Sequence, residues 1–319
     1  MSRTVRAWGR FVGSAATVSV LLWLFGAGPF LDGVRTVDVG ALLASAAVFF
    51  LATVCAAWRW TIVSRGLGVR LSLPAAVAAY YRAVFLNLML PGGVAGDVHR
   101  GVSHGREVHD VSRALRAVVW ERGAGQVVQV VLTVAVLLVL PSPVRSSMPL
   151  VAIAVAVAVL GLVLVARARP GGGGGAWGRA RSAMAGDLRD ALLARRAWLG
   201  IVITSVLVVC GYAVTFLIAA RTAGVTAPPS RMLPLALLVI MVMVLPSVGG
   251  WGPREGATAW AFGAAGLGAE QGVATAVVYG IMVLIASLPG AAVLVVSWSR
   301  RIPHADRTKA PLPEHAAHA

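Results

Sequence analysis

The sequence predicts an all-α protein, a polytopic bundle of about six to eight transmembrane helices. Of the 319 residues, 58% are hydrophobic and only 13% are charged, and the mean hydropathy is +0.83. That is more apolar surface than one soluble core could bury. The chain also carries two similar motifs, LPGGVAGDVHRG at 90–101 and LPSVGGWGPREG at 245–256. Each places proline, glycine and charge within apolar surroundings, which predicts two broken helices.

The apolar runs justify the elements in order, because about 20 apolar residues cross the roughly 30 Å of hydrocarbon. Eight stretches reach or approach this length: 11–31, 37–58, 73–96, 114–140, 147–166, 199–220, 232–251 and 256–298. The first is long enough to be a retained helix instead of a cleaved signal peptide. The last could hold one span with a short interfacial helix, or two tight spans.

One transmembrane domain is therefore expected over 11–298. A basic N-terminus at 1–10 precedes it. A loop at 167–198, rich in glycine and arginine, interrupts it with the composition of a flexible linker. The tail at 299–319 is basic and rich in proline and histidine, so we expect it to be disordered.

Charge patterning predicts the orientation. The formal net charge is +16, but the basic residues flank apolar runs and do not cover one soluble face, which argues against nucleic acid as a partner. Basic clusters at 3–10, 59–70 and 300–307 place both termini on the cytoplasmic side of the cell (plasma) membrane. If 73–96 enters from the cytoplasm and returns, the Arg-containing segments 97–122 and 167–198 are cytoplasmic too. We therefore predict a re-entrant hairpin at 73–96.

The second broken stretch, 232–251, has few flanking charges and leaves two arrangements open. It could dip into the membrane from the outside. Together with the first hairpin it would then form an inverted repeat, in which transporters place their substrate at the repeat interface. A full span followed by two more satisfies the positions of the termini equally well.

Glycine-rich backbone next to a helix start can direct N–H groups at an anion, and a lipid phosphate is the natural anion at this depth. The candidate glycines are Gly92, Gly93, Gly96, Gly249 and Gly250. Arg100 and Arg254 follow them and could bind phosphate in bidentate fashion. Asp97 and Glu255 could balance those charges or contact a cationic headgroup. Proline and glycine could instead merely permit close helix packing, but the recurrence at matching offsets favours a binding site.

A polar stripe follows the first motif on the expected helix 114–140. Its members share one helix face, which should point into the bundle: Arg122, Gln126, Gln129 and Thr133. Ionisable groups inside a span cost about 2.5–3.5 kcal/mol on insertion scales. Glu121 and Arg122 are therefore expected to be paired or to line a hydrated path, unless they snorkel to the interface.

No metal or other cofactor is expected. His99, His104 and His109 are spaced five apart, which fits neither a helix face nor a zinc motif, so they are expected to be solvated loop residues. Cys55 and Cys210 lie within apolar runs, where they act as small hydrophobes.

The segments LNLMLPGGVAGDVHRG, Glu121–Arg122 and LPSVGGWGPREG resemble the flippase-like membrane domain of lysylphosphatidylglycerol synthases of the MprF type, over roughly residues 11–298. The resemblance implies a membrane protein with re-entrant elements that handles an anionic or aminoacylated lipid. Six residues fall on its motif positions: Asp97, Arg100, Glu121, Arg122, Arg254 and Glu255. Ala95 and Gly125 depart from it, because a glycine and an acidic residue, respectively, are usual there.

The expected function is that of a translocase for a lipid or a lipid-linked intermediate. The candidate lipids are an anionic or aminoacylated phospholipid and a polyprenyl-linked lipid. The chain resembles a stand-alone form without the synthase domain, and no ATPase motif is present, so an enzyme is not the favoured interpretation. Two alternatives stay open: a membrane-embedded transferase that uses Asp97 or Glu255 as general base, and a non-catalytic partner of a separately encoded lipid-modifying enzyme.

Overall fold

The computed structural model describes Trp23, 37–90, 92–167, 184, 186–192, 194, 197–245 and 251–299. The expected elements at 11–31 and 299–319 lie outside these residues, apart from Trp23 and Ser299. The described elements are helical, as predicted. The α-helices are α3 (Val39–Gly66), α4 (Leu73–Met89), α5 (Ala95–Glu107), α6 (Val111–Val139), α7 (Met148–Arg167), α9 (Ala197–Thr222), α10 (Pro229–Val242), α11 (Pro253–Ala264) and α12 (Ala269–Ser299). Two short helices, η1 (Arg145–Ser147) and η2 (Leu188–Leu192), complete the set.

Among the described residues, four helices are long and apolar enough to cross a membrane: α3, α6, α9 and α12. The shorter apolar helices are α4, α10 and a stretch at 145–161 that includes most of α7. A polytopic helical bundle is therefore confirmed. The tail 256–298 contains most of α11 and one long helix, α12, so one of its two described helices is long enough to span a membrane.

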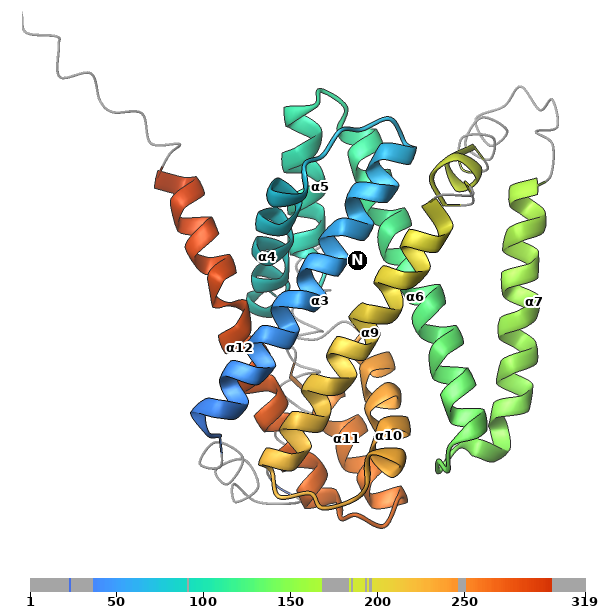
Figure 1. The fold of residues 1–319 in the computed structure, drawn as a ribbon, viewed down its shortest axis with the longest axis vertical. Helices are drawn as coiled ribbons and strands as arrows, with labels where there is room; N and C mark the ends of the chain where they lie inside the picture. The colour runs from blue at the N-terminus through green and yellow to red at the C-terminus, as the bar shows by residue number, and fades with distance from the viewer. Residues whose placement is uncertain are drawn as a thin grey trace, which may run out of the picture.

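Both broken stretches are helical hairpins (Figure 1). The helices α4 and α5 occupy the upper half of the bundle, and α10 and α11 occupy the lower half. At 1.5 Å per residue, the 17 residues of α4 make about 26 Å and the 14 of α10 about 21 Å, both short of the roughly 30 Å hydrocarbon core. Each hairpin therefore turns back inside the bundle.

Proline and glycine explain these turns. Pro74, Pro229 and Pro253 lie in the first turns of α4, α10 and α11, where a missing N–H costs no hydrogen bond. Gly93 has a φ of +67°, and Gly252, at the start of α11, has a φ of +101°. Side-chain-bearing residues rarely adopt these angles. The motifs thus break the helices where the sequence places them.

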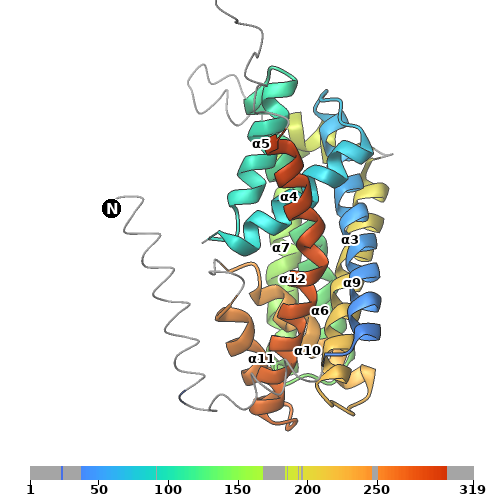
Figure 2. The same ribbon diagram turned by 90° about the vertical axis from the view of Figure 1, so that its left-hand side faces the viewer.

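The described helices form two units of the same order, α3–α4–α5–α6 and α9–α10–α11–α12. The helices α3 and α9 pack along each other and run in opposite directions (Figure 1). The α4 helix packs on α12, and α10 packs on α6. Figure 2 shows the two hairpins entering from opposite ends, with α5 and α11 both beginning near middle height. This is the inverted arrangement that the sequence left open.

Part of the expected flexible loop at 167–198 is packed. In η2, Leu188, Ala191 and Leu192 are buried against Val63 and Ile201. Next to η2, the Asp187 carboxylate accepts hydrogen bonds from Trp120 Nε1 at 3.2 Å and lies 2.8 Å from Arg116 Nε. The described part of this loop therefore closes the end of the bundle where α3 ends.

Candidate functional site

A buried ion network lies where the first hairpin meets α3 and α6. The Glu121 side chain on α6 is fully buried. Arg59 on α3 donates from Nε and Nη2 to Glu121 Oε1 at 2.9 and 2.6 Å, and Arg100 on α5 donates from Nη2 to Glu121 Oε2 at 2.6 Å. The Tyr80 hydroxyl adds a bond to Oε1 at 3.2 Å. One carboxylate therefore joins two arginines from opposite sides.

Asp97 extends this network to the tip of the hairpin. Its Oδ1 accepts from Arg100 Nε at 2.9 Å, and its Oδ2 accepts from Arg122 Nη2 at 2.7 Å. Asn87 at the end of α4 donates to Asp97 Oδ2 at 3.0 Å, while its own carbonyl oxygen accepts from the backbone N–H of Gly96 at 2.7 Å. The hydrogen bonds of Asn87 thus tie the two arms of the hairpin together.

The charges of the network do not cancel. Arg59, Arg100 and Arg122 face two carboxylates, those of Asp97 and Glu121, which leaves one positive charge. Four of these five side chains are buried, whereas 45% of the Arg122 side chain is exposed. Arg122 is 11 residues after Val111, where α6 begins, so it lies about 17 Å into that helix. The unbalanced positive charge is therefore exposed on the protein surface at Arg122, far along α6 from its start.

Aromatic rings hold the arginines in place. The Arg100 guanidinium lies 4.6 Å from the centroid of Trp60 and 4.4 Å from that of Tyr80. The Arg122 guanidinium lies 5.9 Å from the Tyr80 ring. Such contacts stabilise a desolvated cation through the negative face of the ring. Arg59 also donates from Nη1 to Ser205 Oγ on α9 at 3.0 Å, which links the network to the second unit.

The second motif forms its own buried pair at the start of α11. Arg254 donates to Glu255 Oε1 from Nε at 2.9 Å and also from Nη2. The backbone N–H of Gly252 donates to Glu255 Oε2 at 2.7 Å, so Glu255 caps its own helix. The Arg254 guanidinium lies 5.2 Å from the Trp251 ring. Unlike the first network, this pair is neutral.

Few contacts link the two charged groups. Among the described residues, no ion pair or hydrogen bond joins Arg254 or Glu255 to the first network. Because Pro91 and 246–250 lie outside the described residues, a pocket shared by the hairpin tips stays a prediction.

The structure brings four predicted residues, Asp97, Arg100, Glu121 and Arg122, into one network. Arg254 and Glu255 contact each other, Gly92 and Gly93 have positive φ at the turn, and Gly96 packs on the Ala83 backbone. Gly249 and Gly250 lie outside the described residues. Half of the polar stripe points inward: Gln129 and Thr133 are buried, and Gln129 Nε2 donates to Met241 Sδ on α10 at 3.5 Å. The prediction is wrong for Arg122, which is exposed, and Gln126 is only partly buried.

Two expectations need correction. The segment 97–107 is not a solvated loop, because it belongs to α5, and His104 is buried against the Trp60 ring at 5.8 Å between centroids. Arg59 is not an orientation signal, because it is buried in the network. Arg59 could have been found from the sequence, since it has apolar residues on both sides and lies two turns before the end of its helix. Asn87, Tyr80 and Ser205 carried no such signal.

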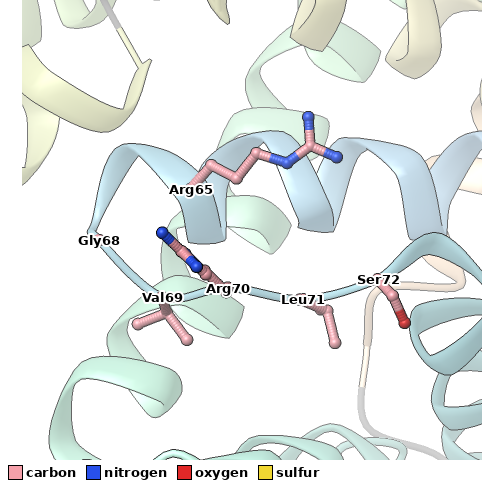
Figure 3. A pocket seen from close by; sticks show the side chains of 6 residues that line it. All are labelled: Arg65, Gly68, Val69, Arg70, Leu71 and Ser72. Atoms are coloured by element: carbon pink, nitrogen blue, oxygen red, sulfur yellow. The ribbon is translucent and has the colours of Figure 1, made fainter.

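A surface cavity of about 700 Å³ lies away from both charged groups, at the loop between α3 and α4 (Figure 3). Its lining includes Arg65, Arg70 and Ser72, the residue before α4. This loop is at the end of the bundle that also carries Arg106 and Arg113. Among the described residues, no group of three His, Cys, Asp or Glu side chains could hold a metal ion.

The fold and these buried ion pairs define a multi-pass membrane protein with charged groups on two opposed hairpins. The family model described as lysylphosphatidylglycerol synthase TM region matches residues 10–290. The chain belongs to this family, as its motifs indicated. No curated protein gives a significant match to the chain.

Proposed function

We propose that the protein binds the phosphate of a membrane lipid headgroup at the first hairpin and moves that lipid, or a lipid-linked intermediate, across the bilayer. The observation that carries the proposal is the unbalanced positive charge of the network, which reaches the surface only at Arg122 among its five charged side chains. Ionisable groups at this depth are costly and generally functional. A phosphodiester carries the single negative charge that would balance the network.

Arg122 is the residue that would contact the ligand. Its guanidinium is half exposed and has one carboxylate partner, Asp97. A headgroup phosphate could displace Asp97 from Arg122 and bind in bidentate fashion. Asp97 would keep its hydrogen bonds from Arg100 and Asn87, so its charge would stay paired. Arg100 is fully buried and would act by holding Asp97 and Glu121 in place.

The second hairpin would take the headgroup from the opposite face. Its position in an inverted repeat supports this role, because opposed broken helices allow access from either side in turn. Arg254 and Glu255 form a neutral pair, so this hairpin holds an anion less strongly than the first. A weaker site on one side would let the lipid leave.

The orientation we propose places the end of the bundle with Arg65, Arg70, Arg106 and Arg113 in the cytoplasm of a cell with this protein in its plasma membrane. This end is basic, as the positive-inside rule requires. The first hairpin would then open to the cytoplasm and the second to the outside.

The test is transbilayer movement of a fluorescent phosphatidylglycerol in proteoliposomes. Losing a hydrogen-bonded charge costs about 1.5–3 kcal/mol, so Arg122→Gln should slow movement by about tenfold or more. The matched control is Arg113→Gln on the same helix, since Arg113 is exposed and, within the described part of the chain, forms an ion pair only with neighbouring Asp110. Equal rates for the Arg122→Gln variant and the unchanged protein would contradict the proposal.

A further inference from the structure

Four buried polar atoms beside the ion network have no hydrogen-bond partner among the described residues. They are Trp60 Nε1, Ser64 Oγ, Arg100 Nη1 and His104 Nε2. Trp60, Ser64 and Arg100 are fully buried, and His104 is 6% exposed. Buried polar groups in native proteins nearly always have a partner, which is often an ordered water. Four such atoms in one region therefore indicate that a bound small molecule forms hydrogen bonds with them.

These atoms lie on two helix faces, one of α3 and one of α5, that point towards each other. Trp60 and Ser64 are one turn apart on α3, and Arg100 and His104 are one turn apart on α5. The Trp60 ring contacts both α5 residues, with the Arg100 guanidinium 4.6 Å and the His104 ring 5.8 Å from its centroid. Trp60, Arg100 and His104 thus form one group, and Ser64 lies one turn further along α3.

The space between these faces is spanned by side chains. The α5 helix packs closely on α4 and α6 but not on α3. Gly101 and Gly105 explain this, because a Cβ at either position would meet Leu115 or Val111 of the adjoining α6. The α5 backbone is therefore drawn towards α6, and only its long side chains reach α3.

The hydrogen-bonding capacity of these atoms indicates which kind of small molecule binds there. Trp60 Nε1 and Arg100 Nη1 can only donate hydrogen bonds. His104 Nδ1 lies 3.5 Å from Glu107 Oε2, and the tautomer that donates to this carboxylate carries its proton on Nδ1. In the neutral ring Nε2 is then an acceptor. An anion could satisfy the donors but not this acceptor, whereas water can satisfy both.

We propose that water molecules occupy a site between α3 and α5, bounded by Trp60, Ser64, Arg100 and His104. The site runs from near the surface, where Glu107 is exposed and Ser64 is two residues from the end of α3, to Arg100 in the network. It hydrates the buried network at Arg100. This proposal does not depend on which ligand, if any, Arg122 binds.

The deciding experiment is X-ray radiolysis of the unchanged protein in lipid nanodiscs, since hydroxyl radicals formed from bound water oxidise the side chains beside it. The readout is oxidation measured by mass spectrometry and normalised to the reactivity of each free amino acid. Trp60 should be oxidised well above Phe216 and Phe262, which are equally buried in the apolar core. Oxidation of Trp60 at or below the level of these two phenylalanines would overturn the proposal.

Two single-cysteine variants give a second measurement. In both of them, Cys55 and Cys210 are replaced by alanine. Ser64→Cys is compared with Thr61→Cys, because Thr61 is equally buried one turn away but its hydroxyl donates to Trp58 O at 2.8 Å. A small charged thiol reagent reaches only hydrated thiols, so it should label Ser64→Cys at least roughly tenfold faster. Equal rates in two folded variants would overturn the proposal.

Discussion

The guanidinium of Arg59 lies directly against the Cα of Gly125, one helical turn beyond Glu121. A Cβ added at Gly125 would lie 2.7 Å from Arg59 Nη1 and 2.8 Å from Cζ. Contacts this close are not tolerated without movement of one partner. The same relationship recurs in the second unit, where a Cβ at Gly280 would overlap the guanidinium of Arg254. In each unit, a glycine on the long helix makes room for a buried arginine.

This relationship predicts the effect of Gly125→Ala. The methyl group would force the Arg59 guanidinium away from Glu121, and overpacking of this kind costs about 1–3 kcal/mol. The melting temperature of the purified protein should therefore fall. The matched control is Gly123→Ala on the same helix, because a Cβ there meets nothing within 4 Å. A Gly125→Ala variant as stable as the Gly123→Ala variant would show that Arg59 is loosely held.

The ion network predicts strong coupling between Arg59 and Glu121. Glu121→Gln leaves the buried Arg59 guanidinium without a carboxylate partner, which typically costs about 3–5 kcal/mol, whereas Arg59→Met leaves Glu121 paired with Arg100 and should cost less. The double variant removes both charges, so its loss of stability should be clearly smaller than the sum of the two single losses. Thermal unfolding of all four proteins measures this coupling. Additive losses would mean that the two side chains do not interact in solution.

Much of the fold could be predicted from the sequence, because membrane spans depend on simple composition and length. The hairpins could be predicted because proline and several glycines cluster within each motif, whereas isolated prolines such as Pro234 in α10 and Pro289 in α12 lie inside continuous helices. The stretch around His99 and His104, expected as a solvated loop, belongs instead to α5, since its polar residues such as Asp97 and His104 are satisfied or buried by other helices. Local polarity resembles a solvated loop, and only tertiary structure distinguishes the two.

The candidate site could be predicted in part. Asp97, Arg100, Glu121 and Arg122 were singled out as charges in apolar surroundings, but their pairing could not be derived, because it depends on how α3, α5 and α6 approach in space. Arg59 was misassigned since a basic residue near a helix end is also typical of an interfacial anchor. Physical packing, not sequence pattern, separates these two roles.

Asp97→Asn should affect lipid binding in the direction opposite to Arg122→Gln. The amide keeps a similar shape but removes the charge that pairs with Arg122 at 2.7 Å. The network would then carry two unbalanced positive charges, and an anionic lipid would meet less competition. We expect tighter binding of phosphatidylglycerol for Asp97→Asn and weaker binding for Arg122→Gln, measured by native mass spectrometry of lipid adducts. Phosphatidylcholine, which is zwitterionic, is the control lipid, and its binding should differ less between the two variants. Weakened phosphatidylglycerol binding in Asp97→Asn would show that Asp97 supports the ligand instead of competing with it.

The turn of the first hairpin predicts a graded response at Gly93. Its φ of +67° lies in the left-handed region, and a Cβ there meets nothing within 4 Å. Any penalty of substitution is therefore one of backbone conformation, and asparagine tolerates this region better than β-branched residues do. Gly93→Val should destabilise the protein by about 1–3 kcal/mol, whereas Gly93→Asn should cost clearly less. Thermal unfolding of the two variants measures the difference. If valine and asparagine cost the same, the turn does not hold Gly93 in the left-handed region, and the hairpin reverses by another route.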